Sequence, residues 1–373
     1  MMPPDPGLIA APSAASLQMS MEPAHNAVNT MSVLASVEEL SGIDDWVVRT
    51  ANAMPPDLLQ NNRIVMSGLG FSVIPDRKWP NFPSFIRFLE TQEPESFRKR
   101  LFSAYAQLAR KKNACKICMP PDPVDESIEM DYRPLLDSFD HFVNFLMKGF
   151  PAECLDLEVE SESFRYLNDP PAMKRFVVDH FKTMWADILS ADWEAGLPKL
   201  QATIDAFHQM ELNKLSRLEA VQQVVGRELE EEWRDIIKAV GTIIFVPSVH
   251  LGPYLRKYRH QDTLRIMFGA RIPEGIRFHA PELDRAQILV RINALADDTR
   301  LRILKLITDE GEKRSTEIMQ ILGLSQSAAS RHLKQLAATG YLTERRCETA
   351  KSYRLNNKRL ENTLGALKCF LSN

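Results

Sequence analysis

The sequence predicts a mainly α-helical protein with a large N-terminal part and a smaller C-terminal part. Apolar residues recur at helical spacing over most of the 373 residues, and only the stretch near 242–272 has short runs of β-branched and aromatic residues bounded by Gly and Pro. The net charge also differs in sign between the two parts. Residues 283–373 hold 16 Lys and Arg against 10 Asp and Glu, a net of +6, and the remainder carries −9. A basic part on an acidic body is typical of a chain in which one part meets a polyanion.

The composition is that of a globular protein, with 45% hydrophobic and 25% charged residues. No apolar run approaches the roughly 20 residues that a membrane-spanning helix needs. The N-terminus lacks the basic leader and apolar core of a secretory signal. Five cysteines in a chain of this length are typical of reduced thiols rather than of a disulfide framework. We therefore expect a cytoplasmic protein with no membrane partner.

The N-terminal part divides into a tail and a domain. Residues 1–25 are rich in Pro, Ala, Ser and Met without periodicity, which predicts a disordered tail. Residues 26–282 predict a mostly helical domain, with helical patterns such as SFIRFLETQ. A small β element is expected near 242–272, where GTIIFVPSVHLGPYL and DTLRIMFGARI occur.

The C-terminal part, 283–373, predicts helices joined to a two-stranded hairpin. DRAQILVRINALAD is apolar on most faces, and a second helix follows from Thr299 with Asp297 and Asp298 at its start. STEIMQIL is a third helix ended by Gly323, and Ser325 can cap a fourth. Two short helices joined by a Gly-containing turn form a helix-turn-helix. YLTERR and SYRLN alternate on either side of a polar turn, which predicts a wing.

The fourth helix carries a polar face suited to DNA. Ser327, Ser330, Arg331 and Lys334 lie at i, i+3, i+4 and i+7, opposite an apolar side. Short hydroxyls allow close approach to a groove, and Arg and Lys reach phosphates or base edges. A solvated face of a structural helix is the alternative, but the turn and the basic wing favour DNA binding. The predicted DNA-binding residues are Ser325, Gln326, Ser327, Ser330, Arg331, His332, Lys334, Arg345, Arg346, Lys351 and Arg354.

The last helix of the chain predicts a homodimer. Its leucines repeat at i, i+4, i+7 and i+11, and the apolar first helix of the C-terminal part is a suitable partner across a two-fold axis. The alternative is that this stripe packs on the body of the same chain. The predicted dimerisation residues are Ile288, Ile292, Leu295, Leu360, Leu364, Leu367 and Leu371.

ALADDTRLRILKLI followed by LGLSQSAASRHLKQLAATGYL resembles the ArsR-type winged helix-turn-helix repressors, over about Leu283 to Asn373. The resemblance implies a sequence-specific transcriptional regulator, a repressor that an effector releases or modulates. Metal-sensing members carry a cysteine motif on the first helix of the helix-turn-helix, or His and Asp ligands on the last helix. Here these places read KRSTEIMQIL and KRLENTLGALKCFL, with Cys369 as the sole such ligand. We therefore expect no metal at these sites and no cofactor, and an effector, a small molecule or a protein partner, that binds the N-terminal domain.

Other features of the body leave alternatives open. An enzyme domain fused to a DNA-binding module is the second interpretation, although no Ser-His-Asp, H-E-x-x-H or P-loop signature occurs and a non-enzyme is expected. Cys115 and Cys118 form a lone C-x-x-C, more typical of incidental thiols than of a zinc site. A basic and aromatic cluster over 250–260 suits either a hydrated hairpin edge or an anion contact, to DNA phosphates or to a ligand.

Overall fold

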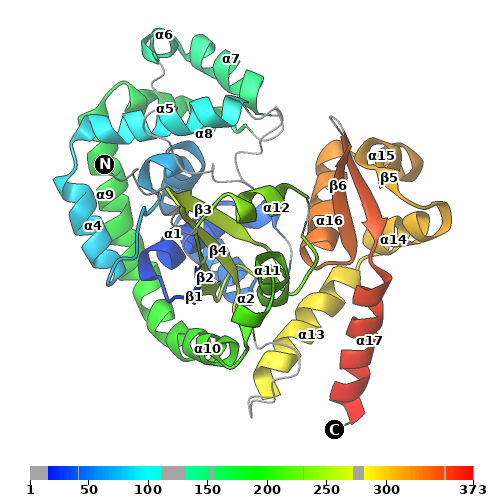
Figure 1. The fold of residues 1–373 in the computed structure, drawn as a ribbon. Coiled ribbons are helices and arrows are strands. Elements are labelled where there is room, and N and C mark those ends of the chain that lie inside the picture. The colour runs from blue at the N-terminus through cyan, green and yellow to red at the C-terminus, as the bar shows by residue number, and fades with distance from the viewer. Residues whose placement is uncertain are drawn as a thin grey trace, which may run out of the picture.

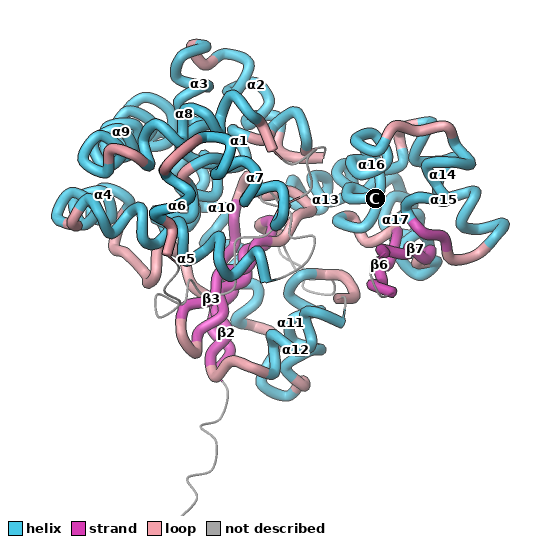
Figure 2. The backbone as a smooth tube through the Cα atoms, turned by 90° about the horizontal axis from the view of Figure 1, so that it is seen from above, coloured by secondary structure: helices cyan, strands magenta, loops and turns pink. Residues whose placement is uncertain are grey.

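The computed structural model describes residues 16–40, 42–110, 131–150, 155–229, 231–271, 281–347 and 350–372. Most of these residues are helical, so the mainly α-helical fold is confirmed (Figure 1). Helices of the N-terminal body surround a small central sheet, and the C-terminal elements lie together to one side of it (Figure 2). None of the helices in these ranges has both the length and the apolar character needed to span a membrane.

The helices of the body pack around a core of aromatic side chains, in which Phe82, Phe102 and Phe181 are almost completely buried. The described helices of the body are α1 (Pro23–Ala35), α2 (Asp45–Ala53), α3 (Pro56–Arg63), α4 (Phe82–Thr91), α5 (Pro94–Arg110), α6 (Arg133–Leu136), α7 (Phe139–Gly149), α8 (Leu157–Leu167), α9 (Pro170–Met184), α10 (Ser190–His208), α11 (Arg217–Val225) and α12 (Glu231–Lys238). Asn81 caps helix α4: its side chain accepts from the Ser84 N–H at 2.8 Å and so satisfies an otherwise unpaired donor.

A four-stranded sheet lies inside the body, in the order β1-β2-β4-β3. Its strands are β1 (Ser16–Met19), β2 (Thr242–Ser248), β3 (Arg256–His260) and β4 (Thr263–Gly269). The β element expected near 242–272 is confirmed. The predicted tail over 1–25 is wrong for its later residues, because β1 pairs in parallel with β2 and α1 begins at Pro23. Strand β1 was missed because four residues are too few for the alternation of a strand to show in the sequence. Residues 1–15 of the predicted tail lie outside the described ranges.

The two faces of the sheet contact different helices, because successive side chains of a strand point to opposite sides. Phe245 and Ile266 pack in one apolar cluster with residues of α11 and α12. Val246 and Met267 belong to the core that surrounds α1. Arg265 alternates with Ile266 along β4 and therefore faces α1.

Polar side chains of the first turn of α1 are buried on this second face. His25 Nδ1 lies 2.7 Å from Glu22 Oε2, and Arg265 Nε donates to the same oxygen at 2.9 Å. Burial alone would raise the pKa of Glu22, but the hydrogen bonds and charges of His25 and Arg265 hold that pKa below its ordinary value. Glu22 is therefore a buried carboxylate that fixes the position of the Arg265 guanidinium.

A second buried histidine makes the stability of the body depend on pH. His180 of α9 is 5% exposed, its Nε2 lies 3.1 Å from Asn62 Oδ1, and burial lowers its pKa to about 4. The unfolded chain, with a His pKa near 6.5, takes up the proton first as the pH falls, so stability is lost from about pH 6.5 down to pH 4. We expect this residue to lower the free energy of unfolding by about 2 kcal/mol between pH 7 and pH 5.

Urea unfolding at both pH values checks this expectation. His180→Gln should remove that part of the pH dependence, because an amide does not titrate in this range. His208→Gln, at the exposed C-terminal end of α10, is the control. If the free energy of unfolding changes equally between pH 7 and pH 5 in wild type and in His180→Gln, His180 is not the source of the pH dependence.

The C-terminal elements form a helix-turn-helix followed by a wing, as the sequence predicts. They are α13 (Pro281–Leu295), α14 (Asp298–Glu310), β5 (Lys313–Arg314), α15 (Ser315–Leu322), α16 (Gln326–Ala338), β6 (Leu342–Cys347), β7 (Ala350–Leu355) and α17 (Asn357–Ser372). The three strands pair in the order β5-β7-β6. Ile303, Leu333 and Tyr341 are fully buried in their common core. The domain boundary between 282 and 283 stays a prediction, and α13 runs across it.

Candidate nucleic-acid interface

The turn between α15 and α16 has the geometry that its sequence dictates. Gly323 ends α15 with φ +65°, a left-handed conformation that glycine adopts without steric cost. Ser325 then caps α16, its hydroxyl accepting from the Ala328 N–H at 3.3 Å. The short connection holds α16 across the preceding helix, as a helix-turn-helix requires.

The first half of α16 presents its polar side chains to solvent. Ala329, Leu333 and Leu336 are completely buried beneath the helix. The residues of the predicted site that are exposed at this end are Ser325, Gln326, Ser327, Ser330 and Arg331. The structure thus brings five of the predicted residues onto one accessible surface, which we call the α16 surface.

The second half of α16 is turned toward the protein. His332, predicted to bind DNA, is 7% exposed and its Nδ1 lies 3.7 Å from Asp297 Oδ1, so it is not part of the α16 surface. Burial lowers the pKa of His332, which keeps the ring neutral at pH 7. Lys334 is only partly exposed, and its Nζ lies 5.7 Å from the ring centre of Tyr254 in the body. The predicted face that runs from Ser327 to Lys334 is therefore divided.

Arg300 orients the second half of α16, and it was not among the residues predicted from the sequence. Its guanidinium is buried and donates to the backbone oxygens of Asn293 and Ala294 at 2.8 and 2.7 Å, and to Gln335 Oε1 at 2.6 Å. Asp297, predicted to lie at the start of α14, caps that helix by accepting from the Arg300 N–H at 2.9 Å. The sequence signal for Arg300 was a charged residue on the buried side of an otherwise amphipathic helix.

Contacts with the body hold the C-terminal end of α16. Arg227 Nη1 donates to the Ala337 oxygen at 3.0 Å, and Arg359 donates to the oxygens of Thr339 at 2.8 Å and Gly226 at 3.1 Å. Ala338 belongs to the apolar core of the body. The Ala337 oxygen also accepts from the Gly340 N–H at 3.0 Å, so the Arg227 bond adds to the backbone bonds that close this end of the helix. Both views place α16 on the side of the C-terminal part that faces the body (Figures 1 and 2).

The wing carries two exposed arginines on one face. Thr343 is opposite Arg354 and Arg345 is opposite Ser352, so Arg345 and Arg354 share a face of the hairpin. Both are exposed. Lys351 lies on the other face, where its Nζ pairs with Glu344 Oε1 at 2.6 Å. Arg346 is opposite Lys351 in β6, and its side chain lies outside the described part of the chain.

The predicted dimerisation helices α13 and α17 lie side by side within one chain (Figure 1). The Tyr341 hydroxyl joins them, since its oxygen lies 3.1 Å from both the Arg291 oxygen and Thr363 Oγ1. Of the predicted dimerisation residues, Ile288 is buried, Leu364 is 54% exposed and the side chain of Leu371 lies outside the described ranges. Those that are partly buried are Ile292, Leu295, Leu360 and Leu367.

No three His, Cys, Asp or Glu side chains converge on a common point in the described part of the chain. Cys115 and Cys118 lie outside the described residues, as do the side chains of Cys347 and Cys369.

Comparison with known proteins supports the assignment of the C-terminal elements. A family model described as "Bacterial regulatory protein, arsR family" matches residues 297–344. The chain is 48% identical over 62 residues to the arsenic resistance transcriptional regulator ArsR1 of Pseudomonas putida, which covers 17% of this chain and 48% of that protein. It is 36% identical over 76 residues to a probable mercury resistance operon repressor of Streptomyces lividans, over 20% of this chain and 60% of that protein.

The ArsR2 regulator of Pseudomonas putida is 44% identical over 63 residues, 17% of this chain and 55% of that relative. The chain thus spans about half the length of these curated relatives, and the matches lie in its C-terminal region. The resemblance drawn from the sequence is confirmed: residues 297–344 are a helix-turn-helix domain of the ArsR family.

Proposed function

We propose that the protein is a homodimeric repressor of transcription that binds a specific operator through the α16 surface and is modulated by an effector in its N-terminal body. The observation that carries the proposal is the exposed, capped first half of α16, where Arg331 lies beside short hydroxyls. A recognition helix contacts base edges with its N-terminal residues. A cytoplasmic location follows from a DNA partner.

We expect the wing and α16 to divide the contact with DNA. Replacing Arg331 with Ala should weaken operator binding by about 1–3 kcal/mol and reduce the preference for the operator over random DNA. Replacing Arg345 and Arg346 should weaken binding to all sequences alike. It should also reduce the slope of the logarithm of the binding constant against the logarithm of the salt concentration, by about one per lost phosphate contact. The reason is that base contacts discriminate between sequences, whereas phosphate contacts do not.

Titrations of both variants on specific and random duplexes, at several salt concentrations, test this division. A footprint on the promoter of the protein's own gene supplies the operator. Lys305→Ala, on the exposed side of α14 and paired with Asp309, is a control that removes a positive charge elsewhere. An operator-to-random ratio that Arg331→Ala leaves unchanged would show that base reading lies elsewhere.

The contacts of the body with α16 support modulation by an effector. Tyr254 lies in the connection between β2 and β3 and contacts Lys334, and Arg227 follows α11 and caps α16. A change in the body that moves either residue would alter the position of α16, and a ligand that favours one arrangement shifts the population toward it.

An enzymatic body is the second candidate, and one pair of residues favours it. His250 Nε2 lies 2.6 Å from Asp192 Oδ2, a separation found in catalytic dyads. The ring is 4% exposed and stacks on Trp46 with centroids 4.5 Å apart, so access of a substrate to it is restricted. We therefore interpret the pair as a packing contact that joins the β2–β3 connection to α10, and propose a sensor rather than an enzyme.

A further inference from the structure

A cavity of about 160 Å³ lies between the N-terminal body and the C-terminal elements. Its walls in the C-terminal part come from α13, the end of α16 and the start of α17, through Val290, Ala338 and Arg359. Its walls in the body are the segment 42–44, α10, the end of α11, the β2–β3 connection and the residues that follow β4. A molecule bound in this cavity would therefore contact α16 and the body at the same time.

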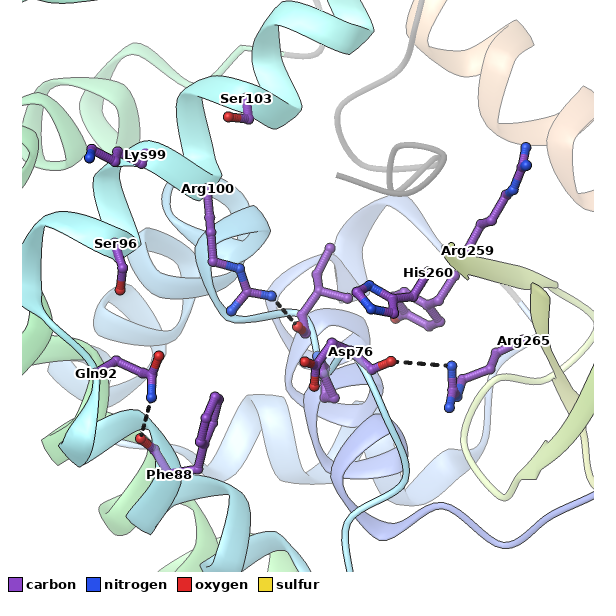
Figure 3. A pocket seen from close by; sticks show the side chains of 13 residues that line it. Asp76, Phe88, Gln92, Ser96, Lys99, Arg100, Ser103, Arg259, His260 and Arg265 are labelled. Atoms are coloured by element: carbon purple, nitrogen blue, oxygen red, sulfur yellow. Dashed lines mark hydrogen bonds between the residues drawn. The ribbon is translucent and has the colours of Figure 1, made fainter. Parts of the chain in front are cut away.

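A larger cavity of about 390 Å³ lies inside the body, next to α5 and the β3–β4 hairpin (Figure 3). Its guanidiniums already have partners. Arg100 donates to the Ile74 oxygen at 2.7 Å. Arg265 is paired with Glu22 at 2.9 Å and reaches the Asp76 backbone oxygen at 3.4 Å. No described residue of the C-terminal part lines this larger cavity, so the smaller one is the better candidate for a site that acts on DNA binding.

The smaller cavity lies at the carboxyl ends of two neighbouring parallel strands. β2 ends at Ser248 and β4 at Gly269, and these two strands pair in parallel along their whole length. Val249 and Ala270, which follow them directly, line the cavity. In open sheets of parallel strands, ligands bind outside this edge, where the segments that leave the strands form a crevice. The topology of the sheet therefore favours a ligand at this position.

The body side of the cavity is a closely packed surface. Gly252 in the β2–β3 connection has φ +58°, and a Cβ at this position would lie 2.6 Å from the Gly42 oxygen. Glycine is the residue that allows the two segments to approach so closely. The segment 42–44 and the β2–β3 connection are therefore fixed against each other, and pockets of this kind are largely formed before a ligand enters.

Much of the lining is apolar and suits a single ring. Ile43, Phe268 and Val290 contribute aliphatic and aromatic surface, and Tyr254 adds a second aromatic ring. An apolar cavity of about 150 Å³ holds one benzene molecule. The volume of about 160 Å³ therefore selects a ligand of one ring with few substituents.

The arginines of the walls have partners within the chain. Arg271 donates to the Gln223 oxygen at 2.6 Å, and Arg359 donates to the Gly226 oxygen at 3.1 Å. Arg291 is 7% exposed and is likewise engaged within the chain. These guanidiniums join segments of the protein, so they do not form a vacant site for an anion.

One cation and one carboxylate of the walls keep capacity for a ligand. Lys199 of α10 is partly exposed and makes no hydrogen bond or ion pair with any described residue. Asp44 Oδ1 accepts from the Trp46 N–H at 2.9 Å and lies 3.9 Å from His250 Nδ1, whereas no described residue donates to Asp44 Oδ2. A hydroxyl can satisfy either group, because it both donates and accepts. A charged ligand would be repelled by one of the two.

We propose that this cavity binds a small uncharged alcohol or phenol with a single ring, and that it is the effector site. The ring packs among Ile43, Phe268 and Val290, and the hydroxyl lies at Lys199 or Asp44. The role as effector site rests on the proposed function, whereas binding of the alcohol does not.

The ligand holds the end of α16 against the body. Tyr254 lines the cavity, and the centre of its ring lies 5.7 Å from Lys334 Nζ of α16. A ligand that packs against Tyr254 and Ala338 favours the arrangement in which Lys334 stays over this ring and away from a DNA phosphate. The protein with bound alcohol should therefore bind its operator less tightly, which makes the alcohol an inducer.

Calorimetric titration of the full chain with benzyl alcohol and phenol tests binding. Benzoate and benzylammonium, at constant ionic strength, are the charged analogues of nearly equal size. Thermal unfolding at up to about 10 mM of each compound is the second readout, because a molecule that binds the native state raises Tm. We expect benzyl alcohol to bind and to raise Tm, and both ions to bind at least about tenfold more weakly. Failure of both uncharged compounds to bind overturns the proposal, as does equal or tighter binding of either ion.

Variants that fill the cavity locate the site. Val290→Trp in the C-terminal part and Ile43→Trp in the body both enlarge partly buried side chains of the walls. Each should weaken binding of benzyl alcohol at least about tenfold, because the indole takes the volume of the ligand. Leu301→Trp, at a leucine of α14 that is 51% exposed, is the matched control and should bind as wild type does. Cooperative unfolding without ligand shows that a variant is folded, and wild-type affinity in either folded cavity variant overturns the site.

Operator titrations keep this proposal apart from the proposed function. Benzyl alcohol should lower the operator affinity of wild type at least about fivefold. It should leave the operator affinity of Ile43→Trp unchanged. A wild-type protein that binds the alcohol but binds no operator would contradict the repressor proposal alone. Binding of the alcohol with unchanged or higher operator affinity overturns the role of the cavity as effector site.

Discussion

Arg300→Ala is expected to lower the free energy of unfolding of the C-terminal elements by about 3–5 kcal/mol. The substitution leaves three acceptors without their donor: the oxygens of Asn293 and Ala294 at the end of α13, and Gln335 Oε1 in α16. Arg300 is 9% exposed, so little solvent can replace these bonds, and burial lowers the pKa of its guanidinium. Hydrogen exchange of α13 to α16 measures the loss locally.

Two variants control the experiment. Arg302→Ala changes an exposed arginine of the same helix and should alter stability by less than about 0.5 kcal/mol. Arg300→Lys keeps the charge but lacks the planar fork, so it should lie between Arg300→Ala and wild type. If the amide hydrogens of α13 to α16 exchange equally fast in Arg300→Ala and Arg302→Ala, Arg300 does not hold α13 and α16 together.

Leu364→Asp combined with Leu289→Asp is expected to convert a dimer into a monomer and to lower operator affinity by about 10²- to 10⁴-fold. Leu289 on α13 and Leu364 on α17 are 48% and 54% exposed, whereas the other apolar residues of the two helices whose side chains the structure describes are at least partly buried. A second copy would cover these leucines across a two-fold axis. A dimer binds two half-sites together, so the monomer loses the gain in effective concentration.

Light scattering at micromolar concentration gives the mass, and titration of the operator gives the affinity. Leu301→Asp, which alters a leucine of α14 that is 51% exposed, is the matched control and should leave the mass unchanged. A monomeric mass for the wild-type protein would exclude the dimer, and the apolar strip on α13 and α17 would then need another explanation.

Local sequence signals predicted the elements of the C-terminal part and the inner side of α16. The Gly323 turn, the Ser325 cap and the spacing of Ala329, Leu333 and Leu336 each depend on near neighbours in the chain, and each occurs as predicted. Helical spacing also placed Lys334 on the surface, and His332 was predicted to bind DNA; for these two residues the prediction was incomplete. Their partners, Asp297 and Tyr254, are distant in sequence, and no periodic pattern reports such contacts.

The same limit applies to the body. Arg265 and Glu22 are 243 residues apart, and β1 joins β2 across a similar separation. The basic and aromatic cluster over 250–260 was visible in the sequence, but its two interpretations could not be separated. The structure divides the cluster: Tyr258 and Lys257 are buried, Tyr254 contacts Lys334, and His260 is exposed.

The contacts of Arg227 and Tyr254 with α16 bear on how the family evolves. The family match covers residues 297–344, yet two side chains that set the position of the last turns of α16 come from outside it. If the protein reads an operator through the α16 surface as proposed, two homologues with identical recognition helices would differ in operator preference when their bodies differ. DNA specificity would then be inherited with the whole chain, and a comparison restricted to the helix-turn-helix would assign the same operators to proteins that had already diverged.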